Sequence, residues 1–373
     1  MVTWHTWNGN ANMKENLMKQ KKVLVAMSGG IDSSVCAFLL KNAGYLPTGV
    51  TMKLWSENET VHDQIEAAPD QNATDAQKIA ERLNIPHQTI ALGNSFRTDV
   101  VDRFILDYTK GLTPNPCVEC NRCIKFGKLM EFSLKSGFDY LATGHYARIE
   151  QEPDGQWQLK KAADATKDQS YFLWSIKKEY LSKILFPLGT YTKQEIRKIA
   201  EAQSFENAHR SDSQDICFVP DGDYASFIQK NSKLSFSQGN FVSLDGSILG
   251  THQGLIHYTV GQRKGLGIAL GYPAFVARKN AEDNTVSLCS DAELYTDVLT
   301  ATNVNLLCDL DFTVSQRIEA KIRYRHAPAP ATARFLSDRR IEVRFDQPQR
   351  AIAPGQSVVF YDGDVVLGGG IIE

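Results

Sequence analysis

Residues 23–35 read Val23-Leu24-Val25-Ala26-Met27-Ser28-Gly29-Gly30-Ile31-Asp32-Ser33-Ser34-Val35. The apolar run before Ser28 predicts a buried strand, and the spacing of apolar residues after Ser34 predicts an amphipathic helix. The turn between them places backbone N–H groups at a helix N-terminus, where anions bind. Gly29 and Gly30 allow the backbone to approach a phosphate closely. No lysine follows the glycines, so this is not a Walker-type loop.

The alternation of strand and helix continues to about residue 145. Helices are predicted at 33–42, 73–83, 96–110 and 121–135, and further strands at 46–54, 87–92 and 140–143. Such alternation indicates an α/β fold with a doubly wound parallel sheet. Ligands bind such sheets at the carboxyl ends of the strands. We therefore expect the Ser28 turn and the segment Thr143-Gly144-His145 to line one crevice.

Beyond residue 239 the pattern changes to short alternating runs separated by glycine turns. Strands are predicted at 241–244, 247–250, 256–260, 274–278 and 286–289, and then at 301–304, 317–324, 332–335, 340–345, 357–361 and 365–368. This spacing predicts a small β-rich central domain followed by a β-barrel. The expected division is a disordered extension over 1–20, the α/β domain over 21–220, the central domain over 221–293 and the barrel over 294–373.

Composition limits the cellular setting and the partners. The 373 residues carry a net charge of −2, no apolar run approaches 18 residues, and residues 1–20 lack the apolar core of a signal peptide. Seven cysteines without a secretion signal favour a reducing cytoplasm. Residues 251–280 carry four Lys or Arg and no acid, and residues 321–350 carry eight against three acids. Such patches attract phosphate backbones or are solvated hairpin faces.

The cysteines are clustered. Cys117, Cys120 and Cys123 lie close together, Cys217 follows in a second context, and Cys36, Cys289 and Cys308 stand in apolar or strand-like runs that predict burial. Three interpretations of the first four compete: a zinc or iron–sulfur site, incidental thiols, or a reactive pair in which one cysteine carries sulfur and the other resolves it.

The environment of Cys120 follows from the residues around it. Pro114 and Pro116 predict an extended loop before the cluster, and a helix is predicted to begin near Asn121. Cys120 would then lie at a helix N-terminus with Arg122 and Lys125 nearby, which lowers the pKa of a thiol.

The pattern Ser-Gly-Gly-x-Asp-Ser at residues 28–33 resembles the PP-loop of ATP pyrophosphatases, which split ATP into AMP and pyrophosphate. From about residue 22 to residue 373 the chain resembles the tRNA-specific 2-thiouridylases, bacterial enzymes that place sulfur on C2 of the wobble uridine. The matching stretches are 28–35, 113–117, 120–122, 124–126, 142–148, 167–173, 186–189, 212–214, 216–218, 254–259, 261–267, 321–325, 354–356 and 367–373.

The resemblance implies roles for individual residues. Cys217 would accept a persulfide, and Cys120 would be the nucleophile that pairs with it through a disulfide. ATP would be bound by Ala26, Met27, Ser28, Gly29, Gly30, Ile31, Asp32 and Ser33, with Met52 and Gly144 near the adenosine. The target base would meet Asn115, Pro116 and Cys117. The tRNA would meet His145, Lys167, Asp168, Gln169, Arg323, Tyr324 and Gln356.

The resemblance also implies chemistry and partners. Adenylation of the uracil C2 oxygen makes AMP the leaving group, and sulfur then attacks C2. Magnesium is expected to bridge the phosphates, with Asp32 as a ligand or as a helix cap. The expected partners are tRNAs for Lys, Glu and Gln and a persulfide donor protein. The chain is expected to act as a monomer in the cytoplasm. The basic β modules would hold the tRNA backbone.

Two departures from the family pattern leave more than one mechanism open. Cys117 stands where many members carry Asp, and Cys123 adds a third thiol. An iron–sulfur cluster held by the cysteines is therefore retained beside the two-thiol mechanism. Two rival hypotheses are another PP-loop enzyme acting on tRNA, such as a lysidine synthetase, and a non-catalytic RNA-binding module. Cys120 and Cys217 argue against both of these rivals.

Overall fold

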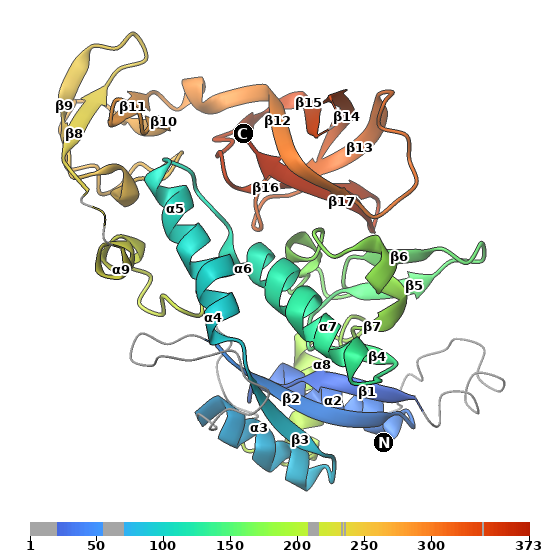
Figure 1. Ribbon diagram of the computed structural model, residues 1–373. Helices are drawn as coiled ribbons and strands as arrows, with labels where there is room; N and C mark the ends of the chain where they lie inside the picture. The colour runs from blue at the N-terminus through green and yellow to red at the C-terminus, as the bar shows by residue number, and fades with distance from the viewer. Residues whose placement is uncertain (1–20, 55–70, 208–215, 233, 235, 338) are drawn as a thin grey trace. The chain divides into compact units, whose positions relative to one another are not determined.

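The computed structural model describes residues 21–54, 71–207, 216–232, 234, 236–337 and 339–373 (Figure 1). The extension expected at residues 1–20 lies outside them. The chain forms two compact units. The first consists of Met1–Asn94, Ile124–Ser170 and Glu179–Ser211, and the second of Ser95–Cys123, Tyr171–Lys178 and Asp212–Glu373. The domain boundaries expected from the sequence stay predictions.

The first unit is built on a five-stranded sheet with the order β3-β2-β1-β4-β7, in which every neighbouring pair is parallel. Its strands are β1 (Lys22–Ala26), β2 (Leu46–Lys53), β3 (His87–Ala91), β4 (Tyr140–Ala142) and β7 (Ile184–Leu185). The central strand β1 lies between β2 and β4, so that Val25 is opposite both Gly49 and Ala142. The predicted α/β fold with a parallel sheet is confirmed.

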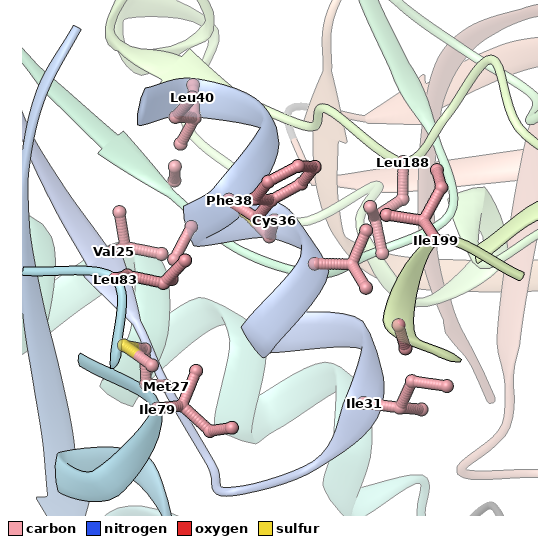
Figure 2. Packing of buried hydrophobic residues seen from close by; sticks show 14 of the residues in the cluster. Val25, Met27, Ile31, Cys36, Phe38, Leu40, Ile79, Leu83, Leu188 and Ile199 are labelled. Atoms are coloured by element: carbon pink, nitrogen blue, oxygen red, sulfur yellow. The ribbon is translucent and has the colours of Figure 1, made fainter. Parts of the chain in front are cut away.

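Helix α2 (Ile31–Asn42) is at the centre of the core of this unit (Figure 2). It packs against β1 and β2, and also against α3 (Gln71–Arg82) and α8 (Lys193–Ala202). Val25 and Ile79 approach it from one side, and Leu188 and Ile199 from the other. Each such side chain contributes roughly 1.5–3 kcal/mol when fully buried. This packing fixes the loop that precedes α2.

Two long helical segments follow β3 in the chain. One comprises α4 (Gly93–Phe96), η1 (Arg97–Asp102) and α5 (Arg103–Thr109), and the other α6 (Pro116–Glu119), η2 (Cys120–Leu129) and α7 (Met130–Lys135). Shorter elements are β5 (Arg148–Gln151), β6 (Trp157–Lys160), η3 (Ser170–Phe172) and η4 (Lys178–Lys183). The predicted helices at 96–110 and 121–135 are present, although the second begins earlier than expected.

The second unit contains a small sheet with the order β10-β11-β8-β9. Its strands are β8 (Gly239–Val242), β9 (Ile248–His252), β10 (Phe275–Asn280) and β11 (Thr285–Cys289), and α9 (Tyr224–Asn231) precedes them. The strand predicted at 256–260 is wrong, because η5 (Leu255–His257) is a 3₁₀ turn there. One such turn brings Leu255 and Tyr258, three residues apart, into the same buried cluster.

The C-terminal strands form a closed antiparallel barrel. They are β12 (Tyr295–Leu306), β13 (Gln316–Lys321), β14 (Ala329–Ser337), β15 (Arg340–Arg350), β16 (Ser357–Asp362) and β17 (Val365–Ile372), preceded by η6 (Ala292–Leu294). Their order is β12-β15-β14-β13-β16-β17, and pairing of β12 with β17 closes the barrel. Alternate residues such as Ile341, Val343 and Phe345 fill its interior. The predicted barrel is confirmed.

Candidate active site

The glycine loop, residues 26–33, connects the carboxyl end of β1 to the start of α2. Gly29 has φ +71°, and a Cβ atom there would lie 2.8 Å from the carbonyl oxygen of Asn72. The Ser33 and Ser34 hydroxyls both donate to the carbonyl of Gly30, at 3.0 Å each. These two hydroxyls hold the loop together, and the side chain of Ser28 is exposed. The loop is therefore a rigid turn whose shape requires glycine.

Further contacts hold the loop from outside its own sequence. The Ser28 N–H donates to the Ser33 hydroxyl at 3.2 Å. The side-chain amide of Asn207 donates to the carbonyl of Gly29 at 2.8 Å and to the Ser34 hydroxyl at 3.0 Å. Met27 and Ile31, on either side of the glycines, are buried in the core. Preorganisation of this kind suits a site that must fix a flexible anion.

Asp32, in the first turn of α2, is one side of an ion pair. Lys193 places its Nζ 2.8 Å from both carboxylate oxygens, and the Tyr146 hydroxyl donates to the carboxylate at 2.8 Å. Asp32 does not cap α2, because the N-cap is Gly30 and it has no side-chain capping bond. Three of about four lone-pair positions of the carboxylate are thus used, leaving room for one bond to a cation such as magnesium.

The neighbouring strands bring two more expected ATP residues to the same sheet edge. Gly144 follows β4, and a Cβ atom there would lie 2.9 Å from the backbone carbonyl carbon of Asp32. Met52 lies in the last residues of β2, beside β1 in the sheet. Ala26 ends β1 itself. The residues expected to bind ATP therefore lie at the carboxyl ends of three adjacent strands.

His145, the residue after Gly144, is buried. Its Nδ1 lies 2.6 Å from the Thr143 hydroxyl and its Nε2 lies 3.3 Å from Lys125 Nζ. The rings of Phe126 and Phe186 pack on it at centroid distances of 5.9 and 5.7 Å. Burial first, and then the positive charge of Lys125, hold the pKa of His145 well below its usual value. The imidazole is therefore neutral at physiological pH.

Lys167, Asp168 and Gln169 form a loop next to Tyr146. The side-chain oxygen of Gln169 accepts from the Tyr146 N–H at 2.9 Å, and the Gln169 N–H donates to the Tyr146 carbonyl at 2.8 Å. Asp168 is buried and accepts hydrogen bonds from the backbone of Ala162 and from the Ser170 hydroxyl. This loop fixes the backbone that carries Tyr146 to Asp32. Contact of these residues with tRNA stays a prediction.

In the second unit, the thiol segment (residues 115–123) begins a helix earlier than expected. The Asn115 side chain caps α6 by accepting from the Cys117 N–H at 3.2 Å, and Pro116 occupies the first helical position. The prediction that a helix starts near Asn121 is wrong. Asn121 is buried, and its side-chain amide donates to the carbonyl of Phe172 at 3.0 Å. Cys117 is in the first turn and exposed, and Cys120 is one turn further on.

The cations expected beside Cys120 are held by other groups. Glu119 accepts from Arg122 Nε at 3.1 Å and also pairs with Arg103 at 3.7 Å. Lys125 lies against His145. The Cys123 thiol lies 3.9 Å from the Glu119 carboxylate, and burial, partly opposed by the charge of Arg122, raises the pKa of Cys123. Because the helix begins at Pro116, Cys120 does not lie at its N-terminus as expected, and activation of its thiol by Arg122 and Lys125 stays a prediction.

Cys217 is exposed on a turn. The next residue, Phe218, holds this turn in place. The ring of Phe218 packs edge-on against Phe104 of α5 at 5.4 Å and lies 5.3 Å from the ring of Phe227 of α9. Glu119, next to Cys120, pairs with Arg103, the neighbour of Phe104. Cys120 and Cys217 are 97 positions apart in the sequence. Their neighbours Glu119 and Phe218 nevertheless contact adjacent residues of α5, Arg103 and Phe104.

The barrel loop at residues 354–356 contacts the chain just before Asn115. Gln356 donates its side-chain amide to the Thr113 carbonyl at 2.8 Å, and the Thr113 N–H donates to the Pro354 carbonyl at 2.8 Å. A Cβ atom at Gly355 would lie 2.8 Å from the Thr113 nitrogen. The close backbone approach requires glycine there. Gln356 therefore positions the start of the thiol segment.

Arg323 and Tyr324 follow β13 of the barrel. The guanidinium of Arg323 donates to the Arg350 carbonyl, and burial, aided by the charge of Arg350, lowers the pKa of Arg323. The ring of Tyr324 stacks on Phe172 at 4.5 Å, and Lys321 Nζ lies 5.5 Å from its centroid. The structure thus places this cationic and aromatic pair within the same unit as the two thiols.

Models of known protein families match the chain in three consecutive parts. A tRNA methyl transferase HUP domain matches residues 21–221, a tRNA methyl transferase PRC-barrel domain matches 225–290, and an aminomethyltransferase beta-barrel domain matches 296–372. Among curated proteins, the tRNA-specific 2-thiouridylase MnmA of Lachnoclostridium phytofermentans is 49% identical over 354 residues, 94% of this chain and 99% of that protein. The MnmA of Clostridioides difficile is 44% identical over 96% of this chain and 99% of that protein.

This chain belongs to the tRNA-specific 2-thiouridylase family. A likeness to a solved structure is much weaker. The U34-tRNA thiolase NcsA of Methanococcus maripaludis with its [4Fe-4S] cluster is 20% identical, with a TM-score of 0.34 over 58% of this chain and 69% of that one. A score of this size carries no argument about the site.

As a member of the 2-thiouridylase family, the chain has two features that its sequence did not reveal. Lys193 and Tyr146 both bind Asp32, yet neither belongs to the glycine loop. A signal for Lys193 was present, because it is the first helical residue after the Thr192 cap and a lysine there opposes the helix dipole. Tyr146 lies in the matching stretch 142–148 but has no predicted role there, and nothing in the sequence pattern singles out Asn207.

The described residues also bear on metals and membranes. Within residues 21–54, 71–207 and the described part of the rest, no group of three or more His, Cys, Asp and Glu side chains is placed to hold a metal ion. In the same part of the chain every helix is too short or too polar to cross a bilayer. Cys36 and Cys289 are buried and Cys308 is half-buried, which confirms the expectation for the first two and partly for the third.

Proposed function

We propose that this chain uses ATP to replace the C2 oxygen of the wobble uridine of tRNA with sulfur. The observation that carries this proposal is the combination of a rigid glycine loop at the carboxyl edge of a parallel sheet with two thiol segments attached to one helix turn. The near full-length identity to curated 2-thiouridylases supports the same reaction. Both halves of the chemistry, activation of the base and delivery of sulfur, have side chains suited to them.

Activation begins at the glycine loop. We assign residues 26–33 to the phosphates of ATP, and Met52 and Gly144 to the adenosine. The uracil O2 attacks the α-phosphorus, pyrophosphate leaves, and C2 now carries an AMP leaving group. Magnesium, where bound, screens phosphate charge, and Asp32 has one lone-pair position left to contact it. Rigid backbone donors suit a leaving group that gains charge as the bond breaks.

Sulfur delivery is assigned to the two thiols. Cys217 takes the outer sulfur of a persulfide from a donor protein, for which an exposed thiol is required. In one route that terminal sulfur attacks C2 and AMP departs, and Cys120 then attacks the Cys217 sulfur, which breaks the S–S bond, releases the thiolated base and leaves a Cys120–Cys217 disulfide. In the other route Cys120 attacks the inner sulfur of the persulfide first, forming the same disulfide and releasing hydrosulfide that attacks C2 with loss of AMP. In both routes a reductant must restore the two thiols. Asn115, Pro116 and Cys117 are assigned to the splayed-out base.

The remaining assignments concern tRNA and setting. We assign His145, Lys167, Asp168, Gln169, Arg323, Tyr324 and Gln356 to the tRNA side of the reaction, for tRNAs of Lys, Glu and Gln acted on in the cytoplasm. Asp168 is buried and accepts from backbone N–H groups, so we assign it the role of fixing neighbouring backbone. His145 is also buried and contacts the side chains of Thr143 and Lys125, whereas Arg323 and Tyr324 have partly exposed side chains that can touch the nucleic acid.

The decisive experiment is nucleoside analysis of tRNA from a deletion strain with and without this chain. We expect 2-thiouridine derivatives to be absent in the deletion strain and restored by the wild-type chain. In vitro, tRNA, ATP and a persulfide donor should yield AMP and pyrophosphate in equal amounts with thiolated tRNA. Restoration without ATP consumption, or ATP consumption with no thiolated nucleoside, would contradict the proposal.

A further inference from the structure

We infer that Lys193 is the phosphate-binding lysine of the glycine loop, delivered from helix α8 and not from the loop's own sequence. This inference rests on the proposed ATP site and adds a residue to it. The glycine loop itself carries no lysine. Lys193 instead reaches the first turn of α2, where its Nζ lies 2.8 Å from both oxygens of Asp32.

Burying the charged side chain of Lys193 costs free energy, which a functional role for the charge would explain. Only 9% of the side chain is accessible to solvent, and lysine is almost never buried to this extent unless it is paired. It is also the first residue of α8, where a positive charge is opposed by the helix dipole. Burial and dipole both disfavour the ammonium, so a hydrophobic residue would stabilise this corner at least as well on packing grounds.

The backbone of Lys193 is held so that the side chain has little choice of direction. Thr192 and Glu195 form a reciprocal capping box around it. The Lys193 N–H donates to the Asp164 carboxylate at 3.1 Å. The ring of Tyr146 lies beside the ammonium, with 5.7 Å between Nζ and the ring centroid. Four groups from three segments thus aim one ammonium at the first turn of α2.

The charges explain why a cation is needed at this point. A carboxylate in the first turn of a phosphate-binding helix repels the phosphates that the backbone N–H groups attract. Lys193 cancels the charge of Asp32 before the nucleotide arrives. Asp32 is the more exposed partner, at 32% of its side chain against 9% for Lys193, so the pair meets solvent on the Asp32 side. A phosphate arriving there competes with Asp32 for the ammonium donors.

Two packed contacts keep this geometry fixed. Gly144 lies so close to Asp32 that an added Cβ would be 3.0 Å from the Ser33 nitrogen. The Tyr146 hydroxyl donates to the same carboxylate oxygen that Lys193 binds. Tyr146 is therefore a positioning residue, Asp32 orients Lys193 in addition to its proposed contact with magnesium, and Lys193 is the group assigned to contact phosphate.

The test compares binding of inorganic pyrophosphate and of adenosine to the full chain by calorimetry. Lys193→Met should raise the Kd for pyrophosphate at least about tenfold, while the Kd for adenosine, which has no phosphate, stays within about twofold of the wild-type value. Lys193→Arg keeps a cation and should lose much less. The matched control is Lys198→Met, an exposed lysine on the same helix, which should bind both probes as the wild type does.

The outcomes separate this inference from the function it rests on. Wild-type pyrophosphate affinity in Lys193→Met would overturn the inference and make Lys193 a purely structural partner of Asp32. If the wild-type chain binds neither ATP nor pyrophosphate, the proposed function fails first. Should Lys193→Met not fold, ¹⁵N-lysine spectra of the wild type decide. The Lys193 Nζ signal, assigned by its loss in Lys193→Arg, must shift with pyrophosphate and not with adenosine, and an unmoved signal overturns the inference.

Discussion

The glycine loop and the thiol segments solve opposite problems. The loop is closed in on itself: Ser33, Ser34 and Asn207 hold its backbone, and Lys193 and Tyr146 hold Asp32. Cys117 and Cys217 are exposed, and Cys120 and Cys217 are placed through adjacent residues, Glu119 and Phe218. A site that activates a nucleotide benefits from rigidity, whereas thiols that receive sulfur from another protein must be reachable.

This contrast predicts that the two regions fail independently. Cys120→Ser and Cys217→Ser should each lower 2-thiouridine in tRNA at least about a hundredfold, because a serine hydroxyl neither carries persulfide sulfur nor attacks it. Both variants should bind ATP with wild-type affinity, since the thiols and the glycine loop belong to different units. Nucleoside analysis and ATP calorimetry on the same preparations check both statements. A variant that still thiolates tRNA would refute the two-thiol mechanism.

Gly29→Ala should weaken ATP binding and leave the thiol chemistry of Cys217 unchanged. Its φ of +71° strains any side chain, and the added Cβ would lie 2.8 Å from a backbone oxygen of α3, so we expect the Kd for ATP to rise by about tenfold or more. Mass spectrometry should show that Cys217 still accepts a persulfide as in the wild type.

The matched control for Gly29→Ala is Gly155→Ala. Gly155 also has a positive φ, +90°, but a Cβ there meets nothing within 4 Å. Gly155→Ala therefore carries the backbone strain without the collision and lies away from the loop. Equal loss of ATP affinity in the two variants would show that the loop's shape is not what binds the nucleotide.

A smaller effect is expected on the pH dependence of folding stability, through His145, the residue after Gly144. His145 has a pKa well below its usual value because it is buried and faces Lys125. It stays neutral in the folded chain while the unfolded chain takes up a proton below about pH 6.5. Stability from this histidine is therefore present above that pH, and is lost by up to about 1.4 kcal/mol per pH unit as the pH falls.

His145→Gln should remove this part of the pH dependence. Urea unfolding at pH 7.0 and 5.5 would measure the free energy of unfolding of both proteins. His87, in the same unit, also has a lowered pKa because of burial, and it remains in the variant as an internal reference. Identical pH dependence in the two proteins would mean that His145 is solvated and that this edge of the sheet is open.

The sequence was sufficient for what depends on local pattern. The alternating units predicted the parallel sheet and the position of the glycine loop, both of which the structure contains. The Asp32–Lys193 pair was missed because its members are 161 positions apart and no local period connects them. The thiol helix begins earlier than the residues predict because Pro116 starts it instead of ending the extended loop before it, and proline is favoured at the first helical position.

The smallest predicted effect concerns Cys123, the third thiol of the cluster. Its pKa is raised by burial, and its sulfur lies 3.9 Å from the Glu119 carboxylate, a setting that disfavours the thiolate. We therefore expect Cys123→Ser to change tRNA thiolation by less than about twofold, with Cys120→Ser as the inactive reference in the same assay. Iron and acid-labile sulfide measured on anaerobically purified protein complete the test. Loss of thiolation together with loss of bound iron in Cys123→Ser would replace the two-thiol mechanism with cluster chemistry. A cluster would hold several cysteines in fixed positions, so the thiol segment would then be more rigid than the glycine loop.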